Sequence, residues 1–500
     1  MKPSSELFEL IKSMTAQEKR YFKLTASMQK GEKIYVRLFD MVDKQLRYDE
    51  SELKNKLTNL DSKDNIAYTK NYLYKLICKS LIQFRNDLSV DSRLGNLYER
   101  SKILYDKALF AQYFKAVKTG KELAQKHERF GYLIEFLEIE RQLVKKEEMV
   151  NKNTDRFYKE ELLTLEKIRN LNEYRRAVSH ILEMHRETGV VRTPDEMTKL
   201  ERLISQADFI SESQAKSVTA AERYSYAMYL FNSISGKFKD ACSFAERRNE
   251  MINKHPEVFE DSISENSKES LYELSRANIR AGNLRSANKN LEEYRKHSGK
   301  SDLDLINVKL LEMLLEIAEC QLTGIPNHKQ VTEHALEFLK SMKGKITIIT
   351  LNDLVYRLAY LGFRKKDFIG AIGLIDLLLN TKNMKLTPQI EVYVRMLLVL
   401  SHYELCNFKL LNFLIPSTAK LLKKKKKLYE SEASVLRHLK RVISLKRDEF
   451  VIEQLQLLAD EIARHNSNDY SANASAYLDY NDWILSKIRE MNVTANVCLR

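Results

Sequence analysis

Glycine and proline are rare in this chain, which contains 13 Gly and 6 Pro among its 500 residues. Average usage would place about 60 of these residues in a chain of this length. Because turns and strand ends depend on them, their scarcity predicts a fold that is almost entirely helical, with short connections. Hydrophobic residues make up 44% of the chain, which is enough for a continuous core. The length exceeds what one compact core holds and predicts several domains or an open, repetitive structure.

One pattern occurs several times: an amphipathic helix, a short break, an aromatic residue or leucine, and a small residue three positions later. It is clearest in residues 268–299, where Gly282 breaks the chain and Leu284 and Ala287 follow. A small residue at the closest crossing lets two antiparallel helices approach, and larger residues one and two turns away fill the space beside it. The same offsets occur, less regularly, in residues 97–128, 222–253, 352–383 and 392–425.

This pattern resembles the tetratricopeptide repeat, a helix–turn–helix unit of about 34 residues. The segments LYDKALFAQYFKAVKTGKELA and KLLKKKKKLYESEASVLRHLKR are also similar to a bacterial group of tetratricopeptide-like proteins. The resemblance implies an all-α fold, a right-handed α-α superhelix (tetratricopeptide-like solenoid), but it implies no activity. We therefore expect an N-terminal helical head in residues 1–90, helical repeats in 91–465 and a C-terminal capping helix in 466–500.

The head lacks the repeat offsets. Thr15-Ala-Gln-Glu18 is a capping box, which predicts that a helix begins at about Ala16. Further helices are expected at 4–12, 33–46, 50–57 and 65–85. The last two can be interpreted as a DNA-binding helix-turn-helix, although the apolar stripe of 65–85 is also typical of an ordinary packed helix. At the other end of the chain, an amphipathic helix carries the only tryptophan, Trp483, and suits the cap that a terminal repeat needs.

Charge and cysteine usage bear on the partners and the compartment. The formal net charge is +14, and residues 401–450 contribute +7 of it because they contain 12 Lys and Arg against 5 Asp and Glu. Such an excess favours anionic partners without determining the fold. The five cysteines are scattered and form no CxxC pair, which favours reduced thiols and a cytoplasmic location. The first residues lack a signal-peptide pattern, and no stretch is long and apolar enough to predict a membrane span.

No motif for catalysis, metal binding or cofactor binding is present in the sequence. It contains no HExxH, GxSxG, GxxxxGK[ST] or GxGxxG, and its ten histidines form no set with metal-ligand spacing. We therefore expect a protein that is not an enzyme and that has no catalytic residues, cofactor or metal. A site built from residues far apart in the sequence stays open as an alternative.

The resemblance also implies candidate binding residues, because the first helix of each tetratricopeptide unit lines a concave groove. Aromatic and arginine side chains dominate the centres of protein interfaces. The chain would then be a non-catalytic protein–protein interaction scaffold that binds a peptide or helix of a partner. Half-buried tyrosines that fill helix–helix contacts are the alternative interpretation. The groove positions are Tyr226, Tyr272, Arg276, Arg280, Tyr356, Tyr360 and Arg364.

A run of five lysines is the most conspicuous local feature: Lys423, Lys424, Lys425, Lys426 and Lys427. It can be interpreted as an anion-binding patch, and with the head it would make the protein a nucleic-acid-associated regulator. Five successive residues at about 100° each cover all sides of a helix, so one lysine would face the core if the helix continued. We therefore favour the solvated end of a helix, where cations are stabilised by the exposed carbonyl groups.

Overall fold

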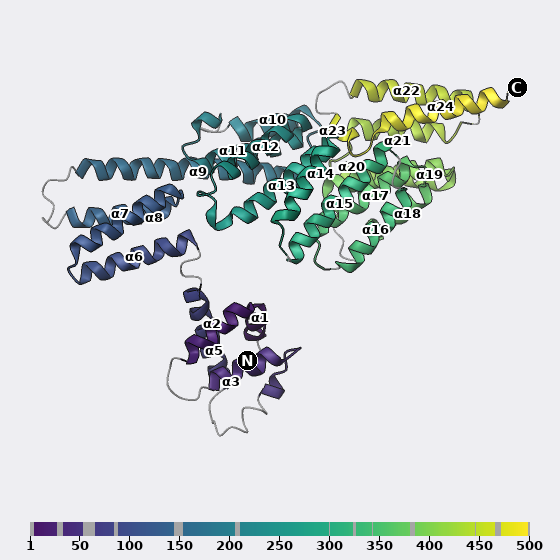
Figure 1. Ribbon diagram of the computed structural model, residues 1–500. Helices are drawn as coiled ribbons and strands as arrows, with labels where there is room; N and C mark the ends of the chain where they lie inside the picture. The colour runs from purple at the N-terminus through teal and green to yellow at the C-terminus, as the bar shows by residue number, and fades with distance from the viewer. Residues whose placement is uncertain are drawn as a thin grey trace. The chain divides into compact units, whose positions relative to one another are not determined.

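Helices are the only regular elements in the described part of the chain, which confirms the predicted all-α class. Figure 1 shows these helices in the computed structural model, where most of them pack against their neighbours in sequence. The described residues are 5–27, 34–53, 66–84, 89–144, 154–205, 211–299, 301–323, 327–342, 344–380, 386–445, 447–465 and 472–498.

The chain divides into two compact units, Met1–Glu161 and Leu162–Arg500, with the boundary inside α9 (Thr154–Thr188). The first predicted repeat, 97–128, therefore belongs to the same unit as the head. The first unit contains α1 (Glu6–Ser13), α2 (Ala16–Ser27), α3 (Ile34–Lys44), α5 (Ile66–Phe84), α6 (Val90–Asp106), α7 (Phe110–Lys126) and α8 (Phe130–Val144).

The second unit contains the candidate binding residues and most of the helices. Its first helices after α9 are α10 (Pro194–Ser205), η1 (Glu212–Gln214), α11 (Val218–Ser235), α12 (Phe238–Lys254), η2 (Glu260–Ser262), α13 (Ile263–Arg280), α14 (Leu284–His297), α15 (Asp302–Thr323) and α16 (His328–Ser341). They are followed by α17 (Ile348–Arg364), α18 (Phe368–Asn380), α19 (Pro388–Glu404), α20 (Phe408–Lys424), α21 (Glu430–Val442), α22 (Asp448–His465), α23 (Ala472–Ser475) and α24 (Tyr480–Cys498).

The capping box predicted in the head is present in the structure. The backbone N–H of Glu18 donates to Thr15 Oγ1 at 3.2 Å, and the backbone N–H of Thr15 donates to Glu18 Oε2 at 2.9 Å. These two bonds satisfy backbone donors that the first turn of a helix leaves without partners. Helix α2 accordingly begins at Ala16, as expected. Of the helix expected at 50–57, residues 50–53 are helical and 54–57 lie outside the described residues.

The same helix–helix turn occurs repeatedly along the chain. In each copy one residue has a positive φ, and the next N–H donates to the carbonyl five residues earlier, as in the Schellman motif. After Gly282, for example, Asn283 N donates to Asn278 O at 2.8 Å, and α14 begins at Leu284. The residues with positive φ in these turns are Ala108, Glu128, Gly236, Gly282, Lys366, Cys406 and Lys426.

Small residues lie where the two helices of a hairpin cross, as the repeated offsets predict. Ala241, Ala287 and Ala371 each follow the break by the same interval, and all three are buried. They belong to the pairs α11–α12, α13–α14 and α17–α18, in which the two helices pack against each other. Small side chains at these positions allow the two helix backbones to approach closely. The predicted hairpin pattern is therefore present in the described residues.

Pro416 lies inside a helix instead of at its start. Helix α20 runs from Phe408 to Lys424 with Pro416 inside it. Proline removes one backbone donor and clashes with the preceding turn, which usually ends or bends a helix. Here Leu411, Ile415 and Leu422 are buried along one face of α20 on both sides of Pro416. Packing of that face accounts for the continuity of the helix.

Candidate functional site

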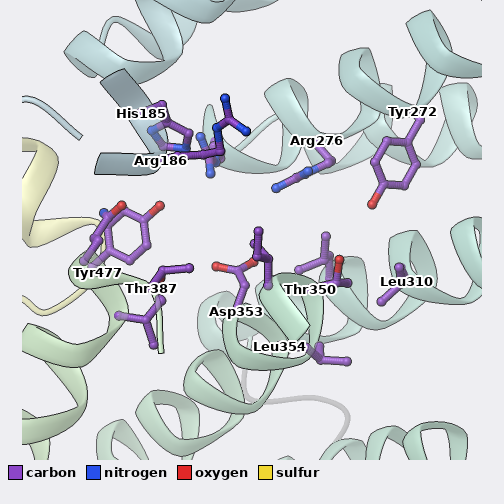
Figure 2. A pocket seen from close by; sticks show the side chains of 15 residues that line it. His185, Arg186, Tyr272, Arg276, Leu310, Thr350, Asp353, Leu354, Thr387 and Tyr477 are labelled. Carbon is purple, nitrogen blue, oxygen red and sulfur yellow. The ribbon is translucent and has the colours of Figure 1, made fainter. Parts of the chain in front are cut away.

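Three of the predicted groove residues line one cavity in the second unit. Tyr272, Arg276 and Arg280 are four residues apart along α13, a spacing that places them on one face of the helix. They border a cavity of about 280 Å³, shown in Figure 2. Arg276 points toward α17, and Tyr272 lies farther along the same wall. The Arg276 guanidinium also lies 5.7 Å from the centre of the Tyr272 ring.

The remaining walls come from parts of the chain that are far apart in sequence. Thr350 and Asp353 of α17 face the arginines, and His185 and Arg186 project from the end of α9. Tyr477, which precedes α24, borders the same end as His185. Apolar side chains complete the lining, namely Leu310, Leu314, Ile349, Leu354 and Ile390. The cavity therefore combines an apolar part with a group of cations.

Positive charge is in excess around this cavity. Asp353 is the only carboxylate among the described residues that line it, and it is paired with Arg357 at 2.9 Å. Burial opposes ionisation of Asp353, but Arg357, Arg276 and Arg280 outweigh that effect and hold the pKa of its carboxyl below the usual value. Burial lowers the pKa of His185, and Arg280 and Arg276 lower it further. The imidazole is therefore neutral at pH 7, while the guanidinium groups stay charged.

Tyr356, Tyr360 and Arg364 do not line this cavity; residues 472–488 contact all three, and the two tyrosines are buried there. We call residues 472–488 the C-terminal segment. Tyr356 is 1% exposed, and its hydroxyl donates to the carbonyl of Tyr477 at 2.8 Å. The N–H of Asp479 donates to the Tyr360 hydroxyl at 3.1 Å. Arg364 pairs with Asp482 at 3.4 Å. These three predicted groove residues therefore bind the chain's own C-terminal segment.

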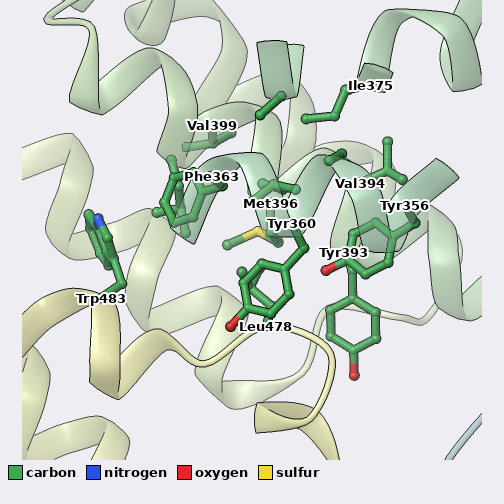
Figure 3. Packing of buried hydrophobic residues seen from close by; sticks show 14 of the residues in the cluster. Tyr356, Tyr360, Phe363, Ile375, Tyr393, Val394, Met396, Val399, Leu478 and Trp483 are labelled. Carbon is green, nitrogen blue, oxygen red and sulfur yellow. The ribbon is translucent and has the colours of Figure 1, made fainter. Parts of the chain in front are cut away.

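The C-terminal segment is firmly packed on the second unit. Leu478, Tyr480, Trp483 and Ile484 are buried, and Figure 3 shows Leu478 and Trp483 against the aromatic residues of α17 and α19. The Tyr477 ring stacks on Tyr393 with 5.1 Å between centroids. Trp483 Nε1 and Lys487 Nζ donate to the two carboxylate oxygens of Glu404 at 2.7 and 2.6 Å. The predicted C-terminal helix is thus present as α24, and it packs against α22.

Tyr226, the remaining predicted groove residue, belongs to a separate cluster around a buried arginine. The guanidinium of Arg248 lies 4.3 Å from the centre of the Tyr226 ring. It pairs with Glu222 at 2.7 Å, with Glu269 at 2.9 Å and also with Glu273. We call Arg248 and these three glutamates the Arg248 cluster. Glu222 also pairs with Arg223 at 3.1 Å, so two guanidinium groups face three carboxylates and protonation of one carboxylate is favoured.

Glu273 of the Arg248 cluster gains a proton near neutral pH. Burial raises its pKa to about 7, which the pairing with Arg248 opposes and nearby Glu269 reinforces. The pKa of Glu273 is higher in the folded protein than in the unfolded chain, so its protonation stabilises the fold. This stabilisation is complete below about pH 4.5 and is lost as the pH rises through about 7. We expect Glu273→Gln to be more stable than the wild type at pH 8, by up to about 3 kcal/mol, and to lose that advantage at pH 5.

Urea denaturation of both proteins at pH 5 and pH 8 measures this difference. Glu250→Gln is the matched control, because Glu250 is exposed on α12 and pairs only with Lys254 among the ion pairs described. The control should shift the free energy of unfolding equally at the two pH values. The same behaviour in Glu273→Gln would show that Glu273 does not titrate in this range.

The lysine run ends a helix, as the favoured interpretation predicted. Helix α20 ends at Lys424, Lys425 is its C-cap, and Lys426 has a φ of 56°. Lys425 pairs with Glu391, and Lys427 Nζ donates to the carbonyl of Thr188 at 3.3 Å. Burial lowers the pKa of Lys427. Two lysines of the run thus have partners within the chain, and the anion-binding role of Lys423, Lys424 and Lys426 stays a prediction.

Sequence reasoning did not identify the residues that complete the cavity. Asp353 lies three positions before Tyr356 on α17, so helical spacing could have suggested it as a neighbour of the predicted site. His185 and Arg186 lie outside every predicted repeat unit. Tyr477 is about two hundred residues from Tyr272 in the sequence. No local pattern connects such distant positions, because only tertiary packing brings them together.

Neither a metal-binding cluster nor a membrane-spanning helix is found in the described part of the chain. No group of three or more His, Cys, Asp or Glu side chains there is arranged to hold a metal ion. None of the helices described combines the length and the apolar character that crossing a bilayer requires.

Comparison with known proteins returned no relative. No protein-family model matches the chain, and neither a curated protein nor a solved structure is similar to it.

Proposed function

We propose that this chain is a non-catalytic scaffold for protein–protein interaction, built as a tetratricopeptide-like superhelix. A peptide or helix of the partner would bind in the concave groove of the repeats, at the cavity beside α13. The observation that most strongly supports this proposal concerns Tyr272, Arg276 and Arg280. These residues were selected from repeat offsets alone, and they border one cavity together. Tyrosine and arginine are the residues that most often supply binding energy at interface centres.

The way the C-terminal segment is held supports a peptide-binding role. The hydroxyl groups of Tyr356 and Tyr360 bind backbone groups of residues 477 and 479. Asn473 Nδ2 donates to the carbonyls of Val191 and Ile234 at 2.9 and 3.3 Å. Side chains that bind backbone groups can hold an irregular segment of many sequences. The neighbouring cavity, with its tyrosines and arginines, would bind a second segment from a partner in a related manner.

Affinity purification of the full chain from the cells that make it, followed by mass spectrometry, tests the scaffold. We expect a protein partner whose recovery falls at least about ten-fold with Tyr272→Ala, the size of loss typical of an interface centre. Tyr158→Ala is the matched control, because Tyr158 is an exposed tyrosine of α9 that does not line the cavity. Recovery that is unchanged by Tyr272→Ala would contradict the assignment of the cavity as the binding site.

The nucleic-acid alternative is favoured by one surface of the head. Tyr68, Tyr72, Lys75 and Lys79 of α5 are all exposed, and their spacing places them on one side of the helix. Exposed aromatic and basic residues together are typical of nucleic-acid-binding surfaces. The same purification with nuclease treatment separates the two functions, since a partner recovered through nucleic acid would be lost on digestion whatever residue occupies position 272.

A further inference from the structure

The cations beside α13 lack the carboxylates that pair arginines elsewhere in the second unit. Arg248 has three glutamates, and Arg192 is paired with Glu432 at 2.8 Å. Among the described residues, by contrast, no ion pair joins Arg276 or Arg280 to a carboxylate, and Asp353 is paired with Arg357. Arg276 and Arg280 are half-buried, and the one carboxylate beside them is already paired with Arg357, so their positive charge is only partly matched.

Such an arrangement is costly unless an anion completes it. Desolvating a charge costs several kcal/mol, and an opposite charge with good geometry offsets that cost. Arginine binds carboxylate and phosphate groups through paired, charge-assisted hydrogen bonds. Arg276 and Arg280 are one helical turn apart, so a single oxyanion can lie between their guanidinium groups. The neutral imidazole of His185 and the hydroxyl of Thr350 line the same space and can donate further hydrogen bonds.

The size and the lining of the cavity restrict what carries the anion. About 280 Å³ is at or below the lower limit of pockets for drug-sized ligands and cofactors. It suits one or two side chains of a peptide. The leucines and Ile390 provide an apolar surface beside the arginines, and the rings of Tyr272 and Tyr477 lie at the two ends. A suitable ligand is therefore an anionic group next to an apolar or aromatic group.

The C-terminal segment does not itself supply this anion, and its displacement by a ligand is unfavourable. Its acidic residues Asp479 and Asp482 lie beside Tyr360 and Arg364, at a different cavity. Releasing the segment would expose Leu478, Tyr480, Trp483 and Ile484. Each large apolar side chain loses about 1.5–3 kcal/mol when it leaves the core. The segment therefore stays in place, with Tyr477 as a fixed wall of the cavity.

We propose that this cavity binds an oxyanion group, a carboxylate or a phosphate, carried by a segment of the partner protein next to an apolar residue. The oxyanion lies between Arg276 and Arg280, and the apolar group packs on Leu310, Leu314 and Ile390. This proposal rests on the proposed scaffold function and specifies the chemistry that the partner presents at the site.

Small aromatic anions test the site directly on the full chain. Phenylacetate and phenyl phosphate each carry an apolar ring and one anion, and phenylacetamide is the neutral analogue. Ligand-observed NMR titration in buffer of low ionic strength measures their dissociation constants. At least one anion is expected to bind about ten-fold more tightly than the amide, because bonds to charged groups are the stronger ones. The tighter anion identifies the source as an acidic side chain or a phosphorylated one.

Two variants and a matched control locate the binding. Arg276→Gln with Arg280→Gln should weaken the anion at least ten-fold, whereas Arg285→Gln, at an exposed arginine of α14, should leave its affinity unchanged. Asp353→Asn removes the competing carboxylate and should strengthen binding several-fold, which keeps the test valid if the double variant does not fold. The proposal would be overturned if neither anion binds, or if the anions bind no more tightly than the amide. It would also be overturned if neither the double variant nor Asp353→Asn changes the affinity for the anion.

The outcome also separates this proposal from the scaffold function. A partner recovered in a Tyr272-dependent manner without any anion binding would preserve the scaffold and remove the oxyanion site. Anion binding without a Tyr272-dependent partner would remove the scaffold and, with it, the statement that a partner segment carries the anion.

Discussion

Replacing Arg248 with methionine is expected to lower the free energy of unfolding by about 3–5 kcal/mol, the range measured when one partner of a buried ion pair is removed. Arg248 and Glu222 are both buried, and Glu269 and Glu273 also contact the guanidinium. Without Arg248, the buried carboxylate of Glu222 keeps only its ion pair with Arg223 and lies beside two other carboxylates. Urea denaturation at pH 8, where the glutamates are most strongly ionised, measures the loss.

Arg247→Met is the control for this prediction. Arg247 precedes Arg248 on α12 but is largely exposed, and it contacts Glu212 only at 3.5 Å. An exposed pair of this kind contributes about 0–1 kcal/mol, so the control should be nearly neutral. Adding Glu222→Gln to Arg248→Met should recover part of the stability, because one of three neighbouring carboxylates is removed. A loss below about 1 kcal/mol for Arg248→Met alone would show that the cluster is not a stabilising centre.

Gly236→Ala is expected to lower the free energy of unfolding by about 2–4 kcal/mol and to displace Asn473 from its position at the start of the C-terminal segment. Gly236 has a φ of 82°, where a side chain adds about 1–2 kcal/mol of backbone strain. An added Cβ would also lie 1.6 Å from Asn473 Oδ1. Asn473 would then move and lose its bonds to Val191 and Ile234, and an unmade buried hydrogen bond costs about 1–3 kcal/mol. Thermal or urea denaturation measures the loss of stability.

Gly282→Ala provides a matched comparison in the equivalent turn. Its φ is 79°, but no heavy atom lies within 4 Å of the added Cβ, so only the backbone strain of about 1–2 kcal/mol is expected. Trp483, the only tryptophan of the chain, reports the position of the C-terminal segment through its fluorescence. Its emission should stay that of a buried tryptophan in both variants, because Leu478, Tyr480 and Ile484 keep the segment packed. Equal destabilisation of the two variants would contradict the role of Asn473, and an emission shift in Gly236→Ala would contradict the stable packing of the segment.

The hairpins were predictable from the sequence because their signals are local. Apolar residues at helical spacing predict the helix faces, and alanine at a fixed interval after the break predicts the crossing point, as Ala287 and Ala371 show. The positions of the turns could be predicted only in part from the sequence. Lys366 and Cys406 have the left-handed conformation in which glycine is expected, so a search for glycine finds Gly236 and Gly282 but not these two positions.

The candidate site was predictable only in part. Repeat offsets identified Tyr272, Arg276 and Arg280, which share one face of one helix and therefore one wall of the cavity. The same offsets assigned Tyr356 to a binding surface, although it is buried beneath Tyr477. Offsets within a repeat determine which side of a helix a residue is on. They do not determine what covers that side.

The sequence by itself determined that this chain is helical and where its clearest hairpins turn, since both depend on residues within one or two turns of each other. Only the tertiary structure decided which tyrosines border a cavity and which lie under residues 472–488. It also decided that Lys425 and Lys427 pair within the chain. The physical reason is that burial and charge pairing depend on contacts between residues that lie far apart in the sequence, such as Tyr356 and Tyr477. No local spacing encodes such contacts.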